Sequence, residues 1–286
     1  MKRISDYKCP EPKEELVTLD CYQKNGIKFP EVHKNRDMIV KYAKLIKNKN
    51  GHPYVDLPFC HTLEADSMGG DINYGNEMTG PRAGKYLFQE LNELLTLPMI
   101  DTKKGRAKIF LDAVRELKSR GEFVVFEVAG PFTILNVLID PSIVFKGMRR
   151  EKDTIVKIFN RFIGILANYI KDLEEAGVDA ISFADPTGGV NILGPKFAEL
   201  YIELFTYDFL RYFEKIDSNL LFILCPKTTL ALVGVGKAEF VDIKLDREMS
   251  YGETFIHLKG KNKFLGHMCI GKANNKLMET KAIRLI

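Results

Sequence analysis

The sequence has 286 residues, of which 45% are hydrophobic and 28% are charged, as is typical of a globular chain that buries a sizeable core. Its 42 Lys and Arg against 38 Asp and Glu give a net charge of +4, too balanced to indicate a nucleic-acid or anionic-membrane partner. No run of about 18 apolar residues occurs, and no apolar signal core follows Met1. We therefore expect a cytoplasmic protein without membrane segments.

The cysteines are odd in number and widely spaced: Cys9, Cys21, Cys60, Cys225 and Cys269. This arrangement argues against a disulfide framework and predicts reduced thiols. Spacing alone does not decide whether individual thiols pack in the core or bind a ligand.

Residues 1–50 differ in character from the rest of the chain. They are charged and contain three prolines, and one amphipathic stretch at residues 37–47 has helical spacing. We predict an N-terminal extension over residues 1–50, packed on a main domain that comprises residues 51–286.

Short apolar runs alternate with long amphipathic ones from residue 54 onward. The runs predict strands at 54–60, 122–128, 179–184, 220–225, 240–245 and 264–269, and helices at 104–120, 153–176, 195–213 and from 228. Alternating strands and helices predict right-handed crossovers and a parallel sheet. The near-continuous apolar strands suit a sheet that is covered on both faces.

The fold class that follows is α/β, with either a closed (β/α)₈ barrel or an open doubly wound sheet. The sequence contains no G-x-G-x-x-G after a first strand and no G-x-x-x-x-G-K-[ST]. Polar residues instead follow many of the predicted strands: Cys60, His61, Glu127, Asp185, Cys225, Asp246 and Cys269. Because strand ends converge at the mouth of a barrel, where catalytic groups collect, we predict a TIM barrel.

Two of these strand-end residues are candidate metal ligands. Cys225 and Cys269 each end a predicted strand, with one further strand between them. Thiolates suit Zn²⁺, and a catalytic site needs three protein ligands. Asp246 or His267 could supply the third. The alternative is that Cys225 is a small buried packing residue, as cysteines often are, and that Asp246 is a turn residue.

Four other residues are candidate substrate-binding groups. His61 and Glu64 follow the first strand, Thr133 follows the strand at 122–128, and Asp185 precedes a flexible Pro-Thr-Gly-Gly segment. Such loops allow a ligand to approach the main chain. The alternatives are a polar loop that begins a helix, an ordinary strand–helix turn at Asp185, and a helix N-cap at Thr133.

Taken in order, the motifs resemble the uroporphyrinogen decarboxylase superfamily. The similar segments are LPFCHTLEADSMG (57–69), AGPFT (129–133), AGVDAISFADP (176–186), LCPKT (224–228) and LGHMC (265–269). Within that superfamily the chain is more similar to the corrinoid-dependent methyltransferase branch, which includes the methylcobamide:coenzyme M methyltransferases. The resemblance implies a TIM barrel over residues 54–280.

The resemblance also implies a zinc site. Methyltransferases of this branch hold zinc with a His-x-Cys pair, a later Cys and an acidic residue, which correspond here to Cys225, Cys269 and Asp246. The chain departs from the pattern at Ile223, where the branch has the histidine, and at Pro226, where it has glycine. Either His267 or Asp246 completes the site, or the zinc has been altered or lost.

The function that the resemblance implies is a zinc-dependent methyltransferase. It would move a methyl group between the methylcobamide of a corrinoid protein and a small-molecule donor or thiol acceptor. The alternative is a decarboxylase-like or non-catalytic member that binds a small molecule or a corrinoid. The decarboxylase branch is disfavoured, because its arginine-rich motif is absent and Arg82 is a lone cation, insufficient for a substrate with many carboxylates.

Overall fold

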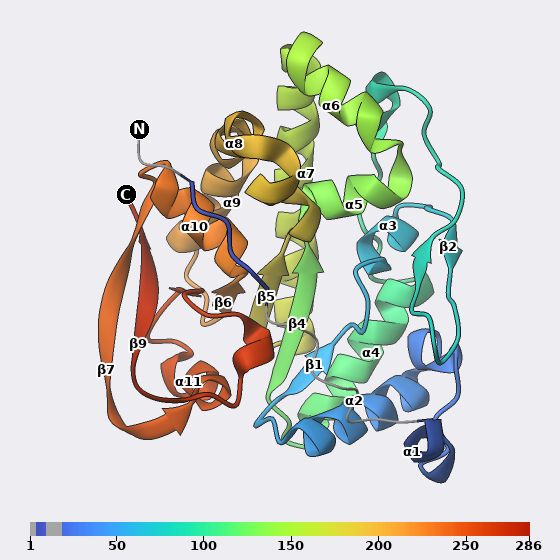
Figure 1. Ribbon diagram of the computed structural model, residues 1–286. Coiled ribbons are helices and arrows are strands. Elements are labelled where there is room, and N and C mark those ends of the chain that lie inside the picture. Colours follow the sequence, from blue (N-terminus) through green and yellow to red (C-terminus); the bar gives the residue numbers. More distant parts are fainter. Residues whose placement is uncertain (1–3, 10–18) are drawn as a thin grey trace.

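The computed structural model describes residues 4–9 and 19–286, which fold around one seven-stranded sheet (Figure 1). Across the sheet the strands are β1 (Val55–Leu57), β4 (Val124–Ala129), β5 (Ala180–Ala184), β6 (Leu221–Leu224), β8 (Phe264–Leu265), β9 (Lys276–Leu285) and β7 (Ala238–Ser250). A small antiparallel pair, β2 (Ile72–Asn73) and β3 (Arg82–Ala83), lies apart from it.

Helices occupy most of the remaining described chain. The α-helices are α1 (Leu19–Lys24), α2 (Arg36–Asn50), α3 (Leu63–Ser67), α4 (Gly105–Ser119), α5 (Pro131–Leu138), α6 (Pro141–Arg150), α7 (Lys152–Ala176), α8 (Val190–Tyr201), α9 (Tyr207–Lys215), α10 (Pro226–Gly234) and α11 (Tyr251–Leu258). Shorter helical turns are η1 (Glu31–His33), η2 (Leu91–Thr96), η3 (Pro186–Gly188), η4 (Ile202–Thr206, a π turn) and η5 (Ile270–Lys272). Helix α7 ends where Gly177 adopts a left-handed conformation, φ 104°.

The predicted α/β class and parallel sheet are confirmed. Strands β1, β4, β5, β6 and β8 are parallel neighbours, in the order expected for consecutive barrel strands. The last two strands differ, because β9 pairs antiparallel with both β8 and β7. Among the strands of the described chain no pairing joins β7 back to β1, so this sheet does not close on itself.

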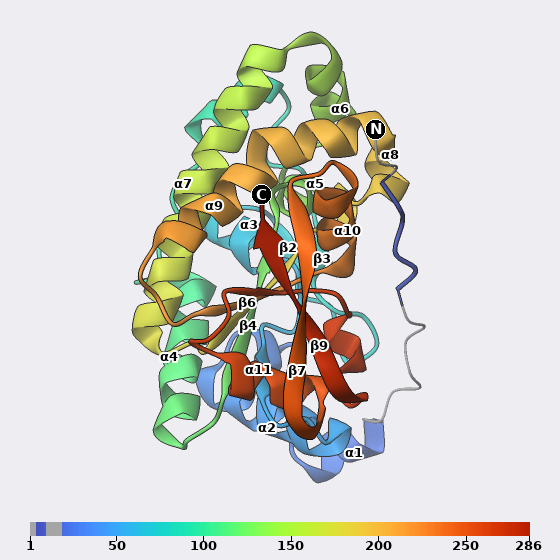
Figure 2. The same cartoon turned by 90° about the vertical axis from the view of Figure 1, so that its left-hand side faces the viewer.

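The prediction of a parallel strand at 240–245, lying between those of Cys225 and Cys269, is wrong. Strand β7 lies at the edge of the sheet, and β6 pairs directly with β8. Figure 2 shows β7 and β9 as a twisted pair in front of the other strands. In residues 241–246 (VDIKLD) both aspartates and Lys244 are exposed, while the apolar residues between them are at least partly buried. Such alternation is typical of antiparallel strands with one face in water.

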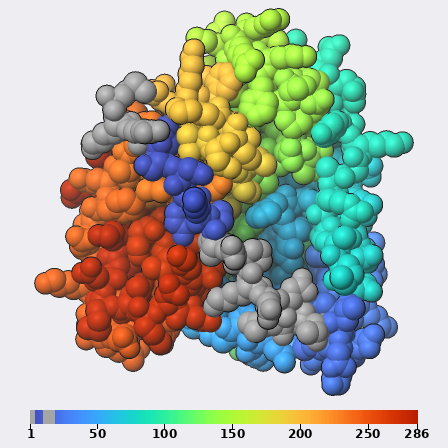
Figure 3. All heavy atoms as spheres, in the orientation of Figure 1, coloured from blue at the N-terminus to red at the C-terminus, as the bar shows by residue number. Residues whose placement is uncertain are grey.

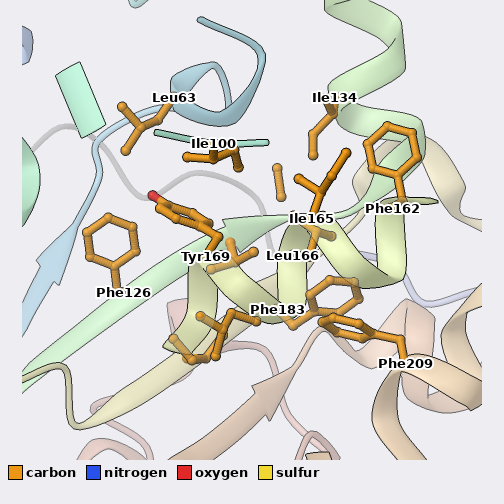
Figure 4. Packing of buried hydrophobic residues seen from close by; sticks show 14 of the residues in the cluster. Leu63, Ile100, Phe126, Ile134, Phe162, Ile165, Leu166, Tyr169, Phe183 and Phe209 are labelled. Carbon is orange, nitrogen blue, oxygen red and sulfur yellow. The ribbon is translucent and has the colours of Figure 1, made fainter. Parts of the chain in front are cut away.

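The main hydrophobic core lies between the sheet and the helices on its outer face. Figure 4 shows Ile165 and Tyr169 of α7 packed near Phe126 of β4 and Phe183 of β5. All four side chains are at most 1% exposed. A second apolar cluster on the opposite face includes Tyr54, Val125, Leu221 and Ile223 with Tyr251 and Phe255 of α11. We call this second side the inner face of the sheet.

Helix α2 and residues 4–9 both contact the main body of the protein. Helix α2, as predicted near residues 37–47, begins after Asn35, whose side chain accepts a 3.0 Å hydrogen bond from the backbone N–H of Met38. It lies against α4 and β1. Residues 4–9 run along α10 (Figures 1 and 3), where a Cβ at Gly234 would lie 2.9 Å from the Cα of Ile4. The division at residue 50 stays a prediction.

None of the helices in the described chain is both long and apolar enough to cross a membrane.

Candidate functional site

The parallel strands bring several reactive side chains to one end of the inner face. The register aligns Glu127 of β4 with Ser182 of β5, and Ser182 with Ile223 of β6. Alternate residues of a strand share a face, so Asp56 of β1, paired with Val125, lies on the same side as Glu127. Glu127 is partly exposed, although its neighbours Phe126 and Val128 are fully buried.

His61 forms an ion pair with Glu127. Its Nδ1 lies 2.5 Å from Oε1 of the carboxylate, and the two side chains are 46% and 21% exposed. The hydrogen bond to Glu127 raises the pKa of His61 to about 8 against the opposing effect of burial. Asp56 is close enough for the charges of Glu127 and His61 to act on its pKa. We call Tyr54, Asp56, His61 and Glu127 the inner-face cluster.

Replacing Glu127 by glutamine is expected to lower the pKa of His61 from about 8 to its ordinary 6.5 or below, because burial then acts unopposed by the carboxylate. NMR titration of the ring C–H resonance measures this value. Glu64→Gln is the control, since the charge of Glu64 is a smaller cause of the raised His61 pKa than the hydrogen bond to Glu127. A His61 pKa that stays near 8 in Glu127→Gln would contradict the ion pair. Because the folded-state pKa is raised, the pair stabilises the fold below about pH 6.5, and this stabilisation is lost as the pH rises through about 8.

Glu64 lies within electrostatic reach of both members of this pair. It is 1% exposed, and its Oε1 accepts a 3.2 Å hydrogen bond from the backbone N–H of Ala129. Burial raises its pKa to about 7. The predicted substrate-binding residues His61 and Glu64 thus lie together, within electrostatic reach of each other.

The other two predicted substrate-binding residues, Asp185 and Thr133, also lie together. They are hydrogen-bonded to each other rather than free to contact a ligand. Asp185 is 4% exposed and accepts four hydrogen bonds: from the backbone N–H groups of Phe132 (3.2 Å) and Thr133 (2.8 Å), the Thr133 hydroxyl (2.6 Å) and the Tyr201 hydroxyl (2.5 Å). The carboxylate therefore holds the first turn of α5, where N–H groups lack helical partners. A Cβ at Gly130 would lie 2.5 Å from Asp185 Cβ, which explains the glycine. These contacts favour a positioning role over substrate contact.

The two candidate thiols follow adjacent strands, without the further strand between them that the sequence predicts. Cys225 comes directly after β6, and Cys269 lies in the loop after β8, immediately before η5. Burial, the largest cause, and the nearby Cys269 thiolate raise the pKa of Cys225 to about 11, and burial also raises the pKa of Cys269. Glu127 also raises the pKa of Cys269, so Cys269 lies within electrostatic reach of the inner-face cluster.

His267 lies two residues before Cys269. Its ring packs edge-on against Tyr251, with centroids 5.4 Å apart. Its Nδ1 is buried and has no hydrogen-bond partner within residues 4–9 and 19–286. Burial lowers the pKa of His267, which favours the neutral imidazole that metals require.

Asp246 is placed differently from the other candidate ligands. It is exposed within β7, between Lys244 and Met249, where the pairing with β9 is interrupted. Across the described ranges no three His, Cys, Asp or Glu side chains are arranged to hold a metal ion. The four-residue ligand set thus stays a prediction.

Sequence reasoning missed several residues of this end of the sheet. Tyr54 and Asp56 lie inside the strand predicted at 54–60. A carboxylate between apolar residues of a buried strand was the available sign that Asp56 belongs to a site. Tyr7 accepts a hydrogen bond from the backbone of Cys269, and a Cys9 thiolate would raise the pKa of both Cys225 and Cys269. No local pattern indicates that the N-terminal segment reaches the thiols.

Known proteins match this chain over most of its length. The profile of the uroporphyrinogen decarboxylase (URO-D) family matches residues 16–270. A methylcobamide:CoM methyltransferase MtbA from Methanosarcina acetivorans is 21% identical over 82% of this chain and 70% of its own. MtaA, a methylcobamide:CoM methyltransferase from Methanosarcina barkeri, is 21% identical over 81% of this chain and 68% of its own.

Among solved structures, a methyltransferase from Methanosarcina mazei superposes with a TM-score of 0.64 at 21% identity. The match covers 74% of this chain and 63% of the chain of that protein. These matches confirm the resemblance predicted from the motifs.

Proposed function

Because the chain belongs to the uroporphyrinogen decarboxylase family, we propose that it is a cytosolic zinc-dependent methyltransferase. It moves a methyl group between the corrinoid of a partner protein and a small-molecule donor or thiol acceptor. The observation that carries the proposal is that Cys225, directly after β6, and Cys269, in the loop that follows the adjacent strand β8, are close enough to interact electrostatically. The similarity to methylcobamide:CoM methyltransferases supports it.

The donor types at this end of the sheet fit zinc. Cys225 and Cys269 supply sulfur, and the unpartnered Nδ1 of His267 supplies the nitrogen that Ile223 lacks. Bound zinc would act as a Lewis acid that lowers the pKa of a ligated thiol or polarises the atom that carries the methyl group. Cys225 and Cys269 bind metal as thiolates, so zinc must displace their protons, and uptake should weaken as the pH falls.

Protein purified anaerobically without chelators is expected to contain about one zinc per chain, as measured by plasma mass spectrometry. Cys225→Ser and Cys269→Ser should each reduce the content by about tenfold or more, because each removes a thiolate. Cys21→Ser is the control, since Cys21 packs in a separate cluster with Tyr22 and Tyr42. Zinc far below one equivalent in the unaltered protein would contradict the proposal and favour a metal-free member.

A variant that introduces the missing histidine tests the same site by a gain, rather than a loss, of zinc affinity. Ile223 is 2% exposed, lies on the inner face and precedes Cys225 by two residues. Ile223→His is therefore expected to raise zinc affinity about tenfold or more by adding a nitrogen donor. Competition with a chelator of known affinity measures it. Unchanged affinity would show that the two thiols do not hold the metal.

A further inference from the structure

Two buried polar atoms of the inner-face cluster have no hydrogen-bond partner among the described residues. Tyr54 is 1% exposed, and neither its hydroxyl nor Oδ1 of Asp56 has a hydrogen-bond partner in the part of the chain that the structure describes. The Tyr54 hydroxyl is within electrostatic reach of Asp56 and Cys269. Because buried polar atoms are almost always satisfied, these two indicate a bound group that the described residues do not supply.

The charges around these atoms indicate the sign of that group. Four carboxyl groups, those of Asp56, Glu64, Glu127 and Asp185, influence the pKa of one another or of the single imidazole, His61. Burial and, secondarily, the charge of Glu127 raise the pKa of Asp56 to about 8. A cation beside Asp56 would offset both effects, whereas an anionic ligand would add to the repulsion.

Two lysines also act on this side of the sheet. Lys272, which is exposed, influences Cys269, and Lys281 influences His267. Lys281 forms an ion pair with Asp242. Neither lysine contributes to the pKa of Asp56, so they do not neutralise the inner-face cluster.

Aromatic rings complete the surroundings. The ring of Tyr54 lies 5.4 Å from that of Phe255, which lies 4.8 Å from Tyr251. Aromatic faces and carboxylates together are the groups that recognise organic ammonium ions.

We propose that the inner-face cluster binds the cationic ammonium group of the small-molecule methyl donor or acceptor. Asp56 and Glu127 supply the countercharge, and Tyr54 supplies a hydroxyl and an aromatic ring. The inference rests on the proposed function for the role of this ligand. Cys269 acts on the pKa of Tyr54, and Glu127 acts on the pKa of Cys269, so the ammonium group would lie near Cys269. It makes an organic cation, rather than a thiol that carries a sulfonate, the preferred ligand.

Choline and its uncharged carbon analogue, 3,3-dimethyl-1-butanol, test the proposal by isothermal titration calorimetry with the full chain. Choline should bind at least about tenfold more tightly than the neutral analogue. Its affinity should rise about tenfold between pH 7 and 9 as Asp56 ionises. Asp56→Asn should weaken choline binding about tenfold at pH 9 and abolish the pH dependence. Asp208→Asn, which alters an exposed aspartate of α9, should change neither.

Equal binding of the two analogues, tighter binding of 2-mercaptoethanesulfonate than of choline, or unaltered choline binding by Asp56→Asn would each overturn the inference. Circular dichroism of Asp56→Asn verifies that the variant is folded. The measurement needs neither zinc nor a corrinoid protein. If the protein contains zinc but does not bind choline, the ammonium site is contradicted and the proposed function stands. If the protein binds choline but contains no zinc, the proposed zinc-dependent function is contradicted and the ammonium site stands.

Discussion

Asp179→Ala is expected to lower the free energy of unfolding by about 3 kcal/mol. Asp179 is 5% exposed and precedes β5. It accepts hydrogen bonds from Lys118 Nζ (2.6 Å), Lys259 Nζ (2.5 Å) and the backbone N–H of Val124 (2.8 Å). Alanine would leave two ammonium groups without a countercharge and one buried N–H without an acceptor. Urea denaturation followed by circular dichroism measures the change.

The control for this prediction is Asp242→Ala. Asp242 also pairs with a lysine, Lys281, but its side chain is 69% exposed. Surface ion pairs contribute about 0–1 kcal/mol, so the control should be nearly neutral. If both variants lose the same free energy, then Asp179 does not connect α4, β4 and α11 as its contacts indicate.

The central strands could be predicted because their signals are local. The buried runs of β4, β5 and β6 and the long apolar face of α7 are visible in the sequence. The C-terminal strands could not be assigned in the same way, because pairing partners depend on contacts far apart in the chain. The alternation at residues 241–246 was the available sign that β7 has a face in water. The pairing of β7 with β9 follows from no local pattern.

The candidate site divides in a similar way. Residues that follow strands, such as His61 and Cys225, could be proposed because parallel strands end at one edge. The assignment of Asp246 depended on a strand between β6 and β8 that the fold does not contain. Tyr7 could not be found at all, since only the folded chain brings its hydroxyl to the backbone of Cys269.

Asp185→Ala is expected to cost about 3–5 kcal/mol of unfolding free energy, the second large effect. Removal of the carboxylate would leave the buried N–H groups of Phe132 and Thr133 and the hydroxyl of Tyr201 without their acceptor. Tyr201→Phe removes one donor and spares the carboxylate, so it should cost about 1–3 kcal/mol. Thermal and urea unfolding of both variants measure the two values.

Asp185→Asn separates the positioning role from the substrate-binding role that the sequence predicts. The amide keeps one oxygen for Thr133, but its nitrogen faces the N–H of Phe132. As a positioning residue, Asp185 should therefore give an asparagine variant of intermediate stability, between the unaltered protein and Asp185→Ala. Were the carboxylate instead free to contact substrate, Asp185→Asn would unfold like the unaltered protein while losing ligand affinity. The four donors around Asp185 favour the first outcome, because they occupy the lone pairs that a substrate would need.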